Sequence, residues 1–89
     1  KHRVYVEEQD AGLTQNEFRL LSLLGKYAGK VLTYDYMMKE IWGPNMKGDN
    51  RILRVNMANI RRKIEKNPGQ PQFIFTEVGV GYRIIETDS

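Results

Sequence analysis

Four arginines in one stretch of this 89-residue chain carry its most distinctive binding chemistry. They lie within residues 50–67 among small apolar and amide side chains, and the set is Arg51, Arg54, Val55, Ala58, Asn59, Arg61 and Arg62. Guanidinium groups pair with phosphates or bind guanine through two hydrogen bonds. Valine and alanine let a backbone approach closely and can contact a thymine methyl group, and asparagine can recognise adenine. These residue types suit a helix that lies in the major groove of DNA.

One amphipathic helix would place these side chains on a common outer face. The apolar residues of the stretch recur at spacings of 4, 3 and 4, in the order Leu53, Met57, Ile60 and Ile64. A helical turn of about 3.6 residues gathers them on one inward stripe. The positions most nearly opposite that stripe are Arg51, Val55, Ala58 and Arg62, and those on its flanks are Arg54, Asn59 and Arg61.

The positive charge of the chain is concentrated in this predicted helix. Residues 50–67 hold six Lys or Arg side chains and one Glu, a net charge of +5, whereas the whole chain carries +3. The rest of the chain is therefore net negative, and the pI of about 9.3 favours an anionic partner. A solvated basic helix that merely packs on a core is the alternative interpretation of the same pattern.

Length and composition limit the class of protein. The chain is long enough for one small domain, and 40% hydrophobic and 28% charged residues are typical of a globular one. The absence of Cys excludes disulfides and thiolate metal sites and fits a cytoplasmic protein. No apolar run approaches the ~20 residues of a membrane span, so we expect no membrane partner. The start at Lys1 rather than Met suggests a piece of a longer protein.

No group of residues is arranged as an enzyme would need. The sequence has no evident carboxylate pair, nucleophile with a base, or cluster of metal ligands, and its one histidine is His2. The Gly79-x-Gly81 pair is followed by no helix and so does not predict a nucleotide-binding loop. We therefore expect no enzyme activity, no cofactor and no metal.

The first half of the chain predicts a short strand and two helices. His2 to Val6 alternates as a strand, and residues 7–12 would form the turn after it. Residues 14–28 should form a helix, because Thr14 and Glu17 match a capping box, with Leu13 and Phe18 placed as a hydrophobic staple. Gly29 would end this helix.

A second helix should follow a short extended link at Val31-Leu32, with Thr33 as its cap and residues 34–42 as its length. Its inner face would hold Met37, Met38 and Ile41. Its positive end, where a phosphate could bind, would expose Tyr34, Tyr36 and Lys39.

The second half of the chain predicts the basic helix and a hairpin. A loop, Gly43 to Gly48, should precede the helix, and either Asp49 or Asn50 would cap it. After the break at residues 67–71, two strands at 73–78 and 82–85 would be joined through Gly79-Val80-Gly81.

This order of elements predicts an α+β fold, the winged helix-turn-helix. The single domain, residues 1–89, would comprise a short and truncated N-terminal β-sheet (1–12), a three-helix core (13–67) and a C-terminal β-hairpin wing (72–86). The third helix would read the major groove, and the wing would reach the backbone or the minor groove.

Motifs along most of the chain resemble the effector domain of OmpR/PhoB-type response regulators. They occur in that family's order and spacing, and they are Leu13-Thr14-x-x-Glu17-Phe18, Val31-Leu32-Thr33, Ile41-Trp42-Gly43, Arg54-Val55-x-Met57-x-x-Ile60-Arg61-x-Lys63-Ile64 and Val78-Gly79-Val80-Gly81-Tyr82-Arg83. The segments around Trp42, Met57 and the wing are most similar to potassium-responsive members, which implies potassium-transport genes as targets.

The resemblance implies a two-component transcription regulator whose receiver domain is absent from this chain. A sensor histidine kinase would phosphorylate that receiver, and two copies would bind direct-repeat half-sites of double-stranded DNA as a dimer. It also implies that Trp42 and Tyr82 contact phosphate, with packing in the core or hairpin as the alternative. The loop Gly43 to Gly48 would contact RNA polymerase.

Two features depart from the family pattern. Val78 occupies a position where several relatives carry an arginine that enters the minor groove, so readout by the wing is weakened. The family has a four-stranded N-terminal sheet, whereas residues 1–12 supply about two strands.

A protein-interaction module is the competing function, in which the basic helix binds an acidic partner. Both interactions are electrostatic, so only a dependence on base sequence separates them.

Overall fold

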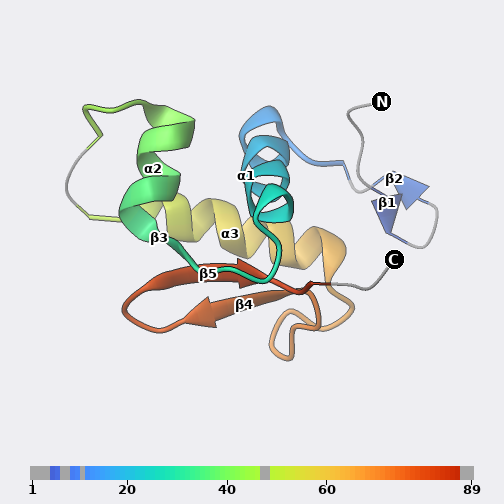
Figure 1. Cartoon of the computed structure of the whole chain (residues 1–89). Coiled ribbons are helices and arrows are strands. Elements are labelled where there is room, and N and C mark those ends of the chain that lie inside the picture. The colour runs from blue at the N-terminus through green and yellow to red at the C-terminus, as the bar shows by residue number, and fades with distance from the viewer. Residues whose placement is uncertain (1–4, 7–8, 11, 47–48, 87–89) are drawn as a thin grey trace.

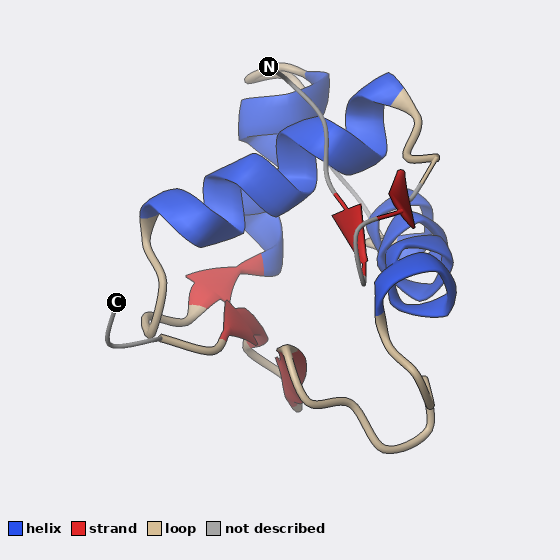
Figure 2. Cartoon of the chain, turned by 90° about the vertical axis from the view of Figure 1, so that its right-hand side faces the viewer, coloured by secondary structure: helices blue, strands red, loops and turns tan. Residues whose placement is uncertain are grey.

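In the part of the chain that the structure describes, three helices pack over one face of a small antiparallel sheet (Figure 1, Figure 2). The computed structural model describes residues 5–6, 9–10, 12–46 and 49–86. The helices are α1 (Gln15–Lys26), α2 (Tyr34–Trp42) and α3 (Arg51–Ile64), and the strands are β1 (Tyr5–Val6), β2 (Gln9–Asp10), β3 (Leu32–Thr33), β4 (Ile74–Glu77) and β5 (Gly81–Ile84). This arrangement confirms the predicted winged helix-turn-helix, with the β4–β5 hairpin (residues 74–84) as the wing.

A third strand pairs with the hairpin at the end of β5 that follows the turn. β5 lies between β4 and β3, with Leu32 opposite Tyr82 and Thr33 opposite Gly81. The predicted extended link at Val31-Leu32 is confirmed at Leu32, but its pairing with β5 as a strand was not predicted. Local sequence could not show this, since the partner strand lies far along the chain.

The N-terminal residues form a separate two-stranded sheet. Tyr5 stands opposite Asp10 and Val6 opposite Gln9. The predicted turn over residues 7–12 is therefore wrong at Gln9 and Asp10, where backbone pairing rather than side-chain preference makes a strand. The predicted strand residues 2–4, including His2, lie outside the described residues, as do residues 7–8 and 11.

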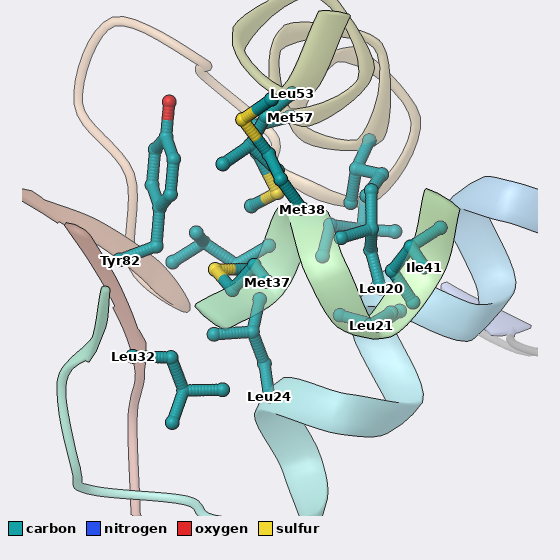
Figure 3. Packing of buried hydrophobic residues seen from close by; sticks show 13 residues of the cluster. Leu20, Leu21, Leu24, Leu32, Met37, Met38, Ile41, Leu53, Met57 and Tyr82 are labelled. Carbon is teal, nitrogen blue, oxygen red and sulfur yellow. The ribbon is translucent and has the colours of Figure 1, made fainter. Parts of the chain in front are cut away.

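The hydrophobic core confirms the predicted apolar stripe of the basic helix. Leu53, Met57 and Ile60 are fully buried, and Ile64 is 6% exposed. They pack with side chains of the other two helices, which are Leu20, Leu21, Leu24, Met37, Met38 and Ile41 (Figure 3). Leu32, Ile74 and Tyr82 of the sheet complete the cluster, so α3 is held between the other helices and the wing.

The predicted caps of the first two helices are present. Thr14 Oγ1 accepts a hydrogen bond from the Glu17 amide at 3.2 Å, and a Glu17 carboxylate oxygen accepts one from the Thr14 amide at 3.0 Å. This is the complete capping box. Thr33 Oγ1 likewise accepts from the Tyr36 amide at 3.1 Å, which begins α2 at the predicted residue.

Both residues predicted as caps of α3, Asp49 and Asn50, lie at its start, but with different roles. Asn50 occupies the cap position but makes no side-chain cap hydrogen bond to the helix backbone. Asp49 Oδ1 instead accepts from the Arg51 amide at 3.1 Å, while Asn50 Oδ1 accepts from Arg54 Nε at 2.8 Å. The side chain before the cap position therefore satisfies the first free amide of the helix.

Glu17 also ties α1 to α3. Its carboxylate is almost fully buried, and Lys63 Nζ lies 2.6 Å from it while also donating to the Gly12 carbonyl oxygen at 3.2 Å. Burial works against the charged form of Glu17, but the hydrogen bonds from Lys63 and Thr14 outweigh burial and hold its pKa below the usual range. This partly buried ion pair links the capping box to the last turn of α3.

A second buried carboxylate ends α3 and positions β4. The helix stops at Ile64, before the predicted end at Asn67, because Glu65 adopts an extended backbone. The Glu65 carboxylate is 6% exposed and accepts hydrogen bonds from the amides of Gln72 at 2.8 Å, Phe73 at 3.0 Å and Ile74 at 2.9 Å. One side chain therefore satisfies the amides of the approach to the wing.

The close contact between β3 and β5 requires glycine at residue 81. A Cβ atom built on Gly81 would lie 1.8 Å from the Leu32 carbonyl oxygen. No larger residue could occupy this site without shifting a strand, so Gly81 serves the third strand as well as the turn.

Replacing Glu65 should strongly destabilise the fold. Glu65→Ala leaves three backbone amides near the core without their acceptor, so we expect a loss of about 2–4 kcal/mol in the free energy of unfolding. Chemical denaturation measures this, with the exposed Glu40→Ala as control, for which we expect a change within about 0.5 kcal/mol. Equal stability of the two variants would contradict the role of Glu65.

The Glu17–Lys63 pair should make stability depend on pH. The folded pKa of Glu17 lies below its unfolded value, so its stabilising contribution is complete above the unfolded pKa and is lost as pH falls through the folded pKa. Glu17→Gln should cost about 1–3 kcal/mol at pH 7, and this difference should shrink below about pH 4.

Urea denaturation at several pH values provides the measurement. Asp35→Asn, which breaks an exposed ion pair to Lys39, serves as control and should cost less than about 1 kcal/mol. A Glu17→Gln effect that stays constant with pH would show that the charge of Glu17 contributes nothing.

Candidate nucleic-acid interface

The exposed face of α3 carries the central residues predicted for DNA binding. Because α3 buries its apolar stripe, the opposite side is open to solvent, and the exposed members of the predicted set are Arg51, Arg54, Val55, Ala58 and Arg62. Val55 is 52% exposed at the centre of this face, although valine is usually buried. An exposed small apolar residue surrounded by arginines is a suitable surface for a major groove.

Among the described residues, the hydrogen bonds and ion pairs of these arginines are local. Arg51 lies 3.6 Å from Asp49, and both side chains are well exposed. Arg54 donates to Asn50, and Arg62 donates to the Asn59 side-chain oxygen. Exposed contacts of this kind contribute little to stability, so phosphate groups or bases can replace them at small cost.

Two cations of α3 are directed into the protein instead. Lys63 pairs with Glu17. Arg61 Nη2 donates to the Ile74 carbonyl oxygen at 3.0 Å and to Thr76 Oγ1 at 2.7 Å. Helical geometry had placed Arg61 on the flank of the outer face, but the wing covers that flank. The structure therefore does not bring Arg61 together with the exposed arginines.

Tyr82 and Trp42 are packed rather than freely exposed. Tyr82 is 4% exposed, and its ring meets that of Tyr34 edge-on at 5.6 Å. Trp42 is partly buried against the core. Tyr34 is partly buried as well, so its predicted outward orientation is wrong, because β5 passes close enough for the two rings to pack.

The Tyr82 phenol remains neutral in this setting. Burial of the ring raises the pKa of Tyr82, and Tyr34 adds to the rise, while Arg61 and Arg54 oppose it. A neutral phenol keeps its proton as a hydrogen-bond donor. Because the ring is buried, Tyr82 contributes to the fold mainly by packing, and its phenol group remains a hydrogen-bond donor.

The other predicted contact regions lie beside this face. Tyr36 and Lys39 are exposed on α2, as predicted. Lys39 lies in the last turn of the helix rather than at its positive end, and it pairs with Asp35 at 3.2 Å. In the predicted polymerase-contacting loop, Met46 packs against the core while Pro44 and Asn45 are exposed. Residues 47–48 of that loop lie outside the described residues.

The sequence assigned no binding role to two exposed residues of the wing, Thr76 and Val80. Thr76 is an exposed wing residue whose hydroxyl accepts from Arg61. Val80 is 50% exposed at the wing tip, next to Val78 at 90%. A threonine in a strand and a valine between glycines are common, so only the tertiary arrangement singles them out.

Two features of other functional classes are absent from the described part of the chain. Residues 5–6, 9–10, 12–46 and 49–86 contain no group of three or more acidic, His or Cys side chains that could hold a metal ion. Within the same ranges, no helix has both the length and the apolar character to cross a membrane.

Comparison with known proteins identifies the family. Residues 8–84 match the family described as "Transcriptional regulatory protein, C terminal". The chain is 42% identical over 78 residues to the KDP operon transcriptional regulatory protein KdpE of Escherichia coli. This match covers 88% of this chain and 35% of KdpE. It is 39% identical over 85 residues to the alkaline phosphatase synthesis transcriptional regulatory protein PhoP of Bacillus subtilis. This match covers 96% of this chain and 35% of PhoP. The chain thus spans about a third of the length of these relatives.

Solved structures give the same result. The response regulator DrrB of Thermotoga maritima, an OmpR/PhoB homologue, superposes with a TM-score of 0.85 at 30% identity, over 94% of this chain and 38% of DrrB. The RstA DNA-binding domain of Klebsiella pneumoniae, solved in complex with the RstA box, superposes with a TM-score of 0.84 at 25% identity. The match covers 93% of this chain and 82% of the RstA domain.

The family is one of DNA-binding regulators rather than enzymes. Sequence motifs, winged-helix fold and similarity to known members therefore agree that this chain belongs to the OmpR/PhoB family of two-component response regulators, as a DNA-binding effector domain that regulates transcription.

Proposed function

We propose that this domain binds specific sequences of double-stranded DNA by placing α3 in the major groove. The observation that carries the proposal is the exposed face of α3, where Arg51, Arg54 and Arg62 surround Val55 and Ala58. The arginines would contact phosphates and guanine, and the two small residues would admit the backbone and contact thymine methyl groups. Asn59 would add adenine recognition after releasing Arg62.

Trp42 and Tyr82 have a lesser place in this proposal. Both are packed, so they would reach phosphate only through their polar edges, the indole N–H and the phenol O–H. We also propose that the domain is divided into three parts, which are an N-terminal sheet (1–12), a helical core (13–67) and a wing (72–86).

Membership of the family supports a proposal for the regulatory setting. Two copies would bind direct-repeat half-sites as a dimer in the cytoplasm, and the loop at residues 43–48 would contact RNA polymerase. A receiver domain, phosphorylated by a sensor histidine kinase, would control this binding. The 42% identity to KdpE supports potassium-transport genes as targets.

A protein-interaction role for the same basic face is the competing function. The exposed arginines would then bind an acidic protein surface, and DNA binding would be purely electrostatic. Because both interactions weaken as salt rises, salt dependence alone does not separate them.

Selection from random duplex DNA tests the proposal. We expect enrichment of a short half-site whose preference over a scrambled duplex persists at physiological salt. If all duplexes instead bind equally and dissociate together as salt rises, the basic face is only an electrostatic surface.

The selected sequence then tests the assignment of the binding face. Arg62→Ala should weaken specific binding by roughly 1–3 kcal/mol, because a guanidinium contact to phosphate or base is lost. Lys39→Ala removes one positive charge from α2 and should matter less, which makes it a control matched in charge. Titration of labelled duplex measures both, and equal negligible effects would contradict the assignment of α3.

A further inference from the structure

Asn50 stands at the cap position of α3, but its side chain is used differently from those of the other two caps. Thr14 and Thr33 have an extended backbone, with ψ of 169° and 155°, and each side chain accepts a hydrogen bond from its own helix. An extended backbone is typical of a residue that caps in this way. Asn50 instead has φ −97° and ψ 27°, and it makes no such bond. Because Asp49 accepts from the Arg51 amide, the carboxamide of Asn50 is available for another contact.

That contact is made to Arg54, one turn further along α3. Asn50 Oδ1 accepts from Arg54 Nε at 2.8 Å, and the Asn50 carbonyl oxygen accepts from the Arg54 backbone amide at 2.9 Å. One residue therefore holds both the backbone and the side chain of this arginine. Since a long arginine side chain otherwise samples many rotamers, a hydrogen bond at Nε restricts the direction in which the guanidinium points.

The hydrogen bond leaves the outer end of the Arg54 guanidinium available to a ligand. Among the described residues, this side chain donates through Nε alone. Arg62, by contrast, uses Nη2 to donate to Asn59. The Nη2 atom of Arg51 lies 3.6 Å from the Asp49 carboxylate. Of the three exposed arginines of α3, Arg54 is thus the one whose Nη1 and Nη2 atoms can bind a new partner while its local contact stays in place.

Guanine is the base that suits this pair of donors. In the major groove it presents the acceptors O6 and N7 side by side, and an arginine binds them through two N–H groups. With Nε already bound, Arg54 can offer only Nη1 and Nη2, which fixes an end-on approach. Phosphate makes no such demand, because a point charge such as lysine also binds it. A guanidinium that is oriented in advance loses less freedom on binding, so the fixed geometry favours the matching base.

We propose that Asn50 is a positioning residue for base readout, which holds Arg54 at Nε so that Nη1 and Nη2 read one guanine of the half-site. Arg51 and Arg62 then serve as phosphate contacts. This inference rests on the proposed sequence-specific binding. It gives a specificity-determining role to a residue whose sequence position indicates only a helix cap.

Order in the free protein tests the contact without DNA. In Asn50→Ala, the NMR order parameter of the Arg54 Nε–H bond should fall below about 0.6, the value for a flexible group, whereas Asn56→Ala should leave it unchanged. Asn56 is a matched control, because it is another asparagine of α3 and its side chain donates to the Ile52 carbonyl oxygen. An Arg54 side chain that is equally ordered in both variants would overturn the proposal.

Base preference on the selected half-site tests the role in readout. In wild type, replacing the guanine that Arg54 reads should weaken binding by about 5- to 150-fold, the range for one bidentate contact. Arg54→Lys keeps the charge but lacks the fork, so it should abolish this preference and thereby identify the base pair. Asn50→Ala should reduce the preference at least about threefold at the same base pair only. The slope of log affinity against log salt should not change in either variant, because no phosphate contact is lost.

Arg62→Lys provides the comparison for a phosphate contact, since it should lower affinity without changing the preference at any base pair. Full retention of the guanine preference in Asn50→Ala, or an equal loss at every base pair, would overturn the proposal. Failure of sequence-specific binding would appear as equal affinity of wild type for selected and scrambled duplexes. Because the order parameters are measured without DNA, the two failures are distinguishable.

Discussion

Burial of one side of α3 is the constraint on which the rest of the structure depends. Leu53, Met57 and Ile60 have no exposed surface, and burying such side chains contributes roughly 1.5–3 kcal/mol each. A helix anchored along one stripe must present the opposite stripe to solvent. The hydrophobic core therefore determines which stripe of α3 is exposed, and the wing covers the flank that carries Arg61.

Two buried carboxylates fix the position of that helix relative to α1 and β4. Glu17 pairs with Lys63 on the α1 side, and Glu65 accepts the amides that lead into β4. Both act on the C-terminal end of α3, which is opposite to the end where Arg51 begins the exposed face. The helix is thus held firmly at its C-terminal end, while Arg51 and Arg54 near the other end, and Arg62 on the exposed side of the last turn, keep exchangeable local contacts.

The positive charge of α3 serves two purposes that composition cannot separate. Arg51, Arg54 and Arg62 lie in solvent with local partners, whereas Arg61 and Lys63 hold the wing and α1. The net charge of +5 in residues 50–67 therefore overstates the charge that faces a partner. Basic residues in the last turn of α3 can therefore bind neighbouring elements of the same protein, as Arg61 and Lys63 do.

Much of this protein follows from local sequence. Periodicity and capping residues predicted α1, α2 and α3, the buried stripe, the hairpin and the exposed Arg51, Val55 and Arg62, because a helix depends on residues three or four apart. The β3 strand, the inward turn of Tyr34, the role of Glu65 and the partners of Arg61 were decided only by tertiary structure. In each case the partner lies on another element, and a side chain on the flank of a helix faces solvent or protein according to what packs there.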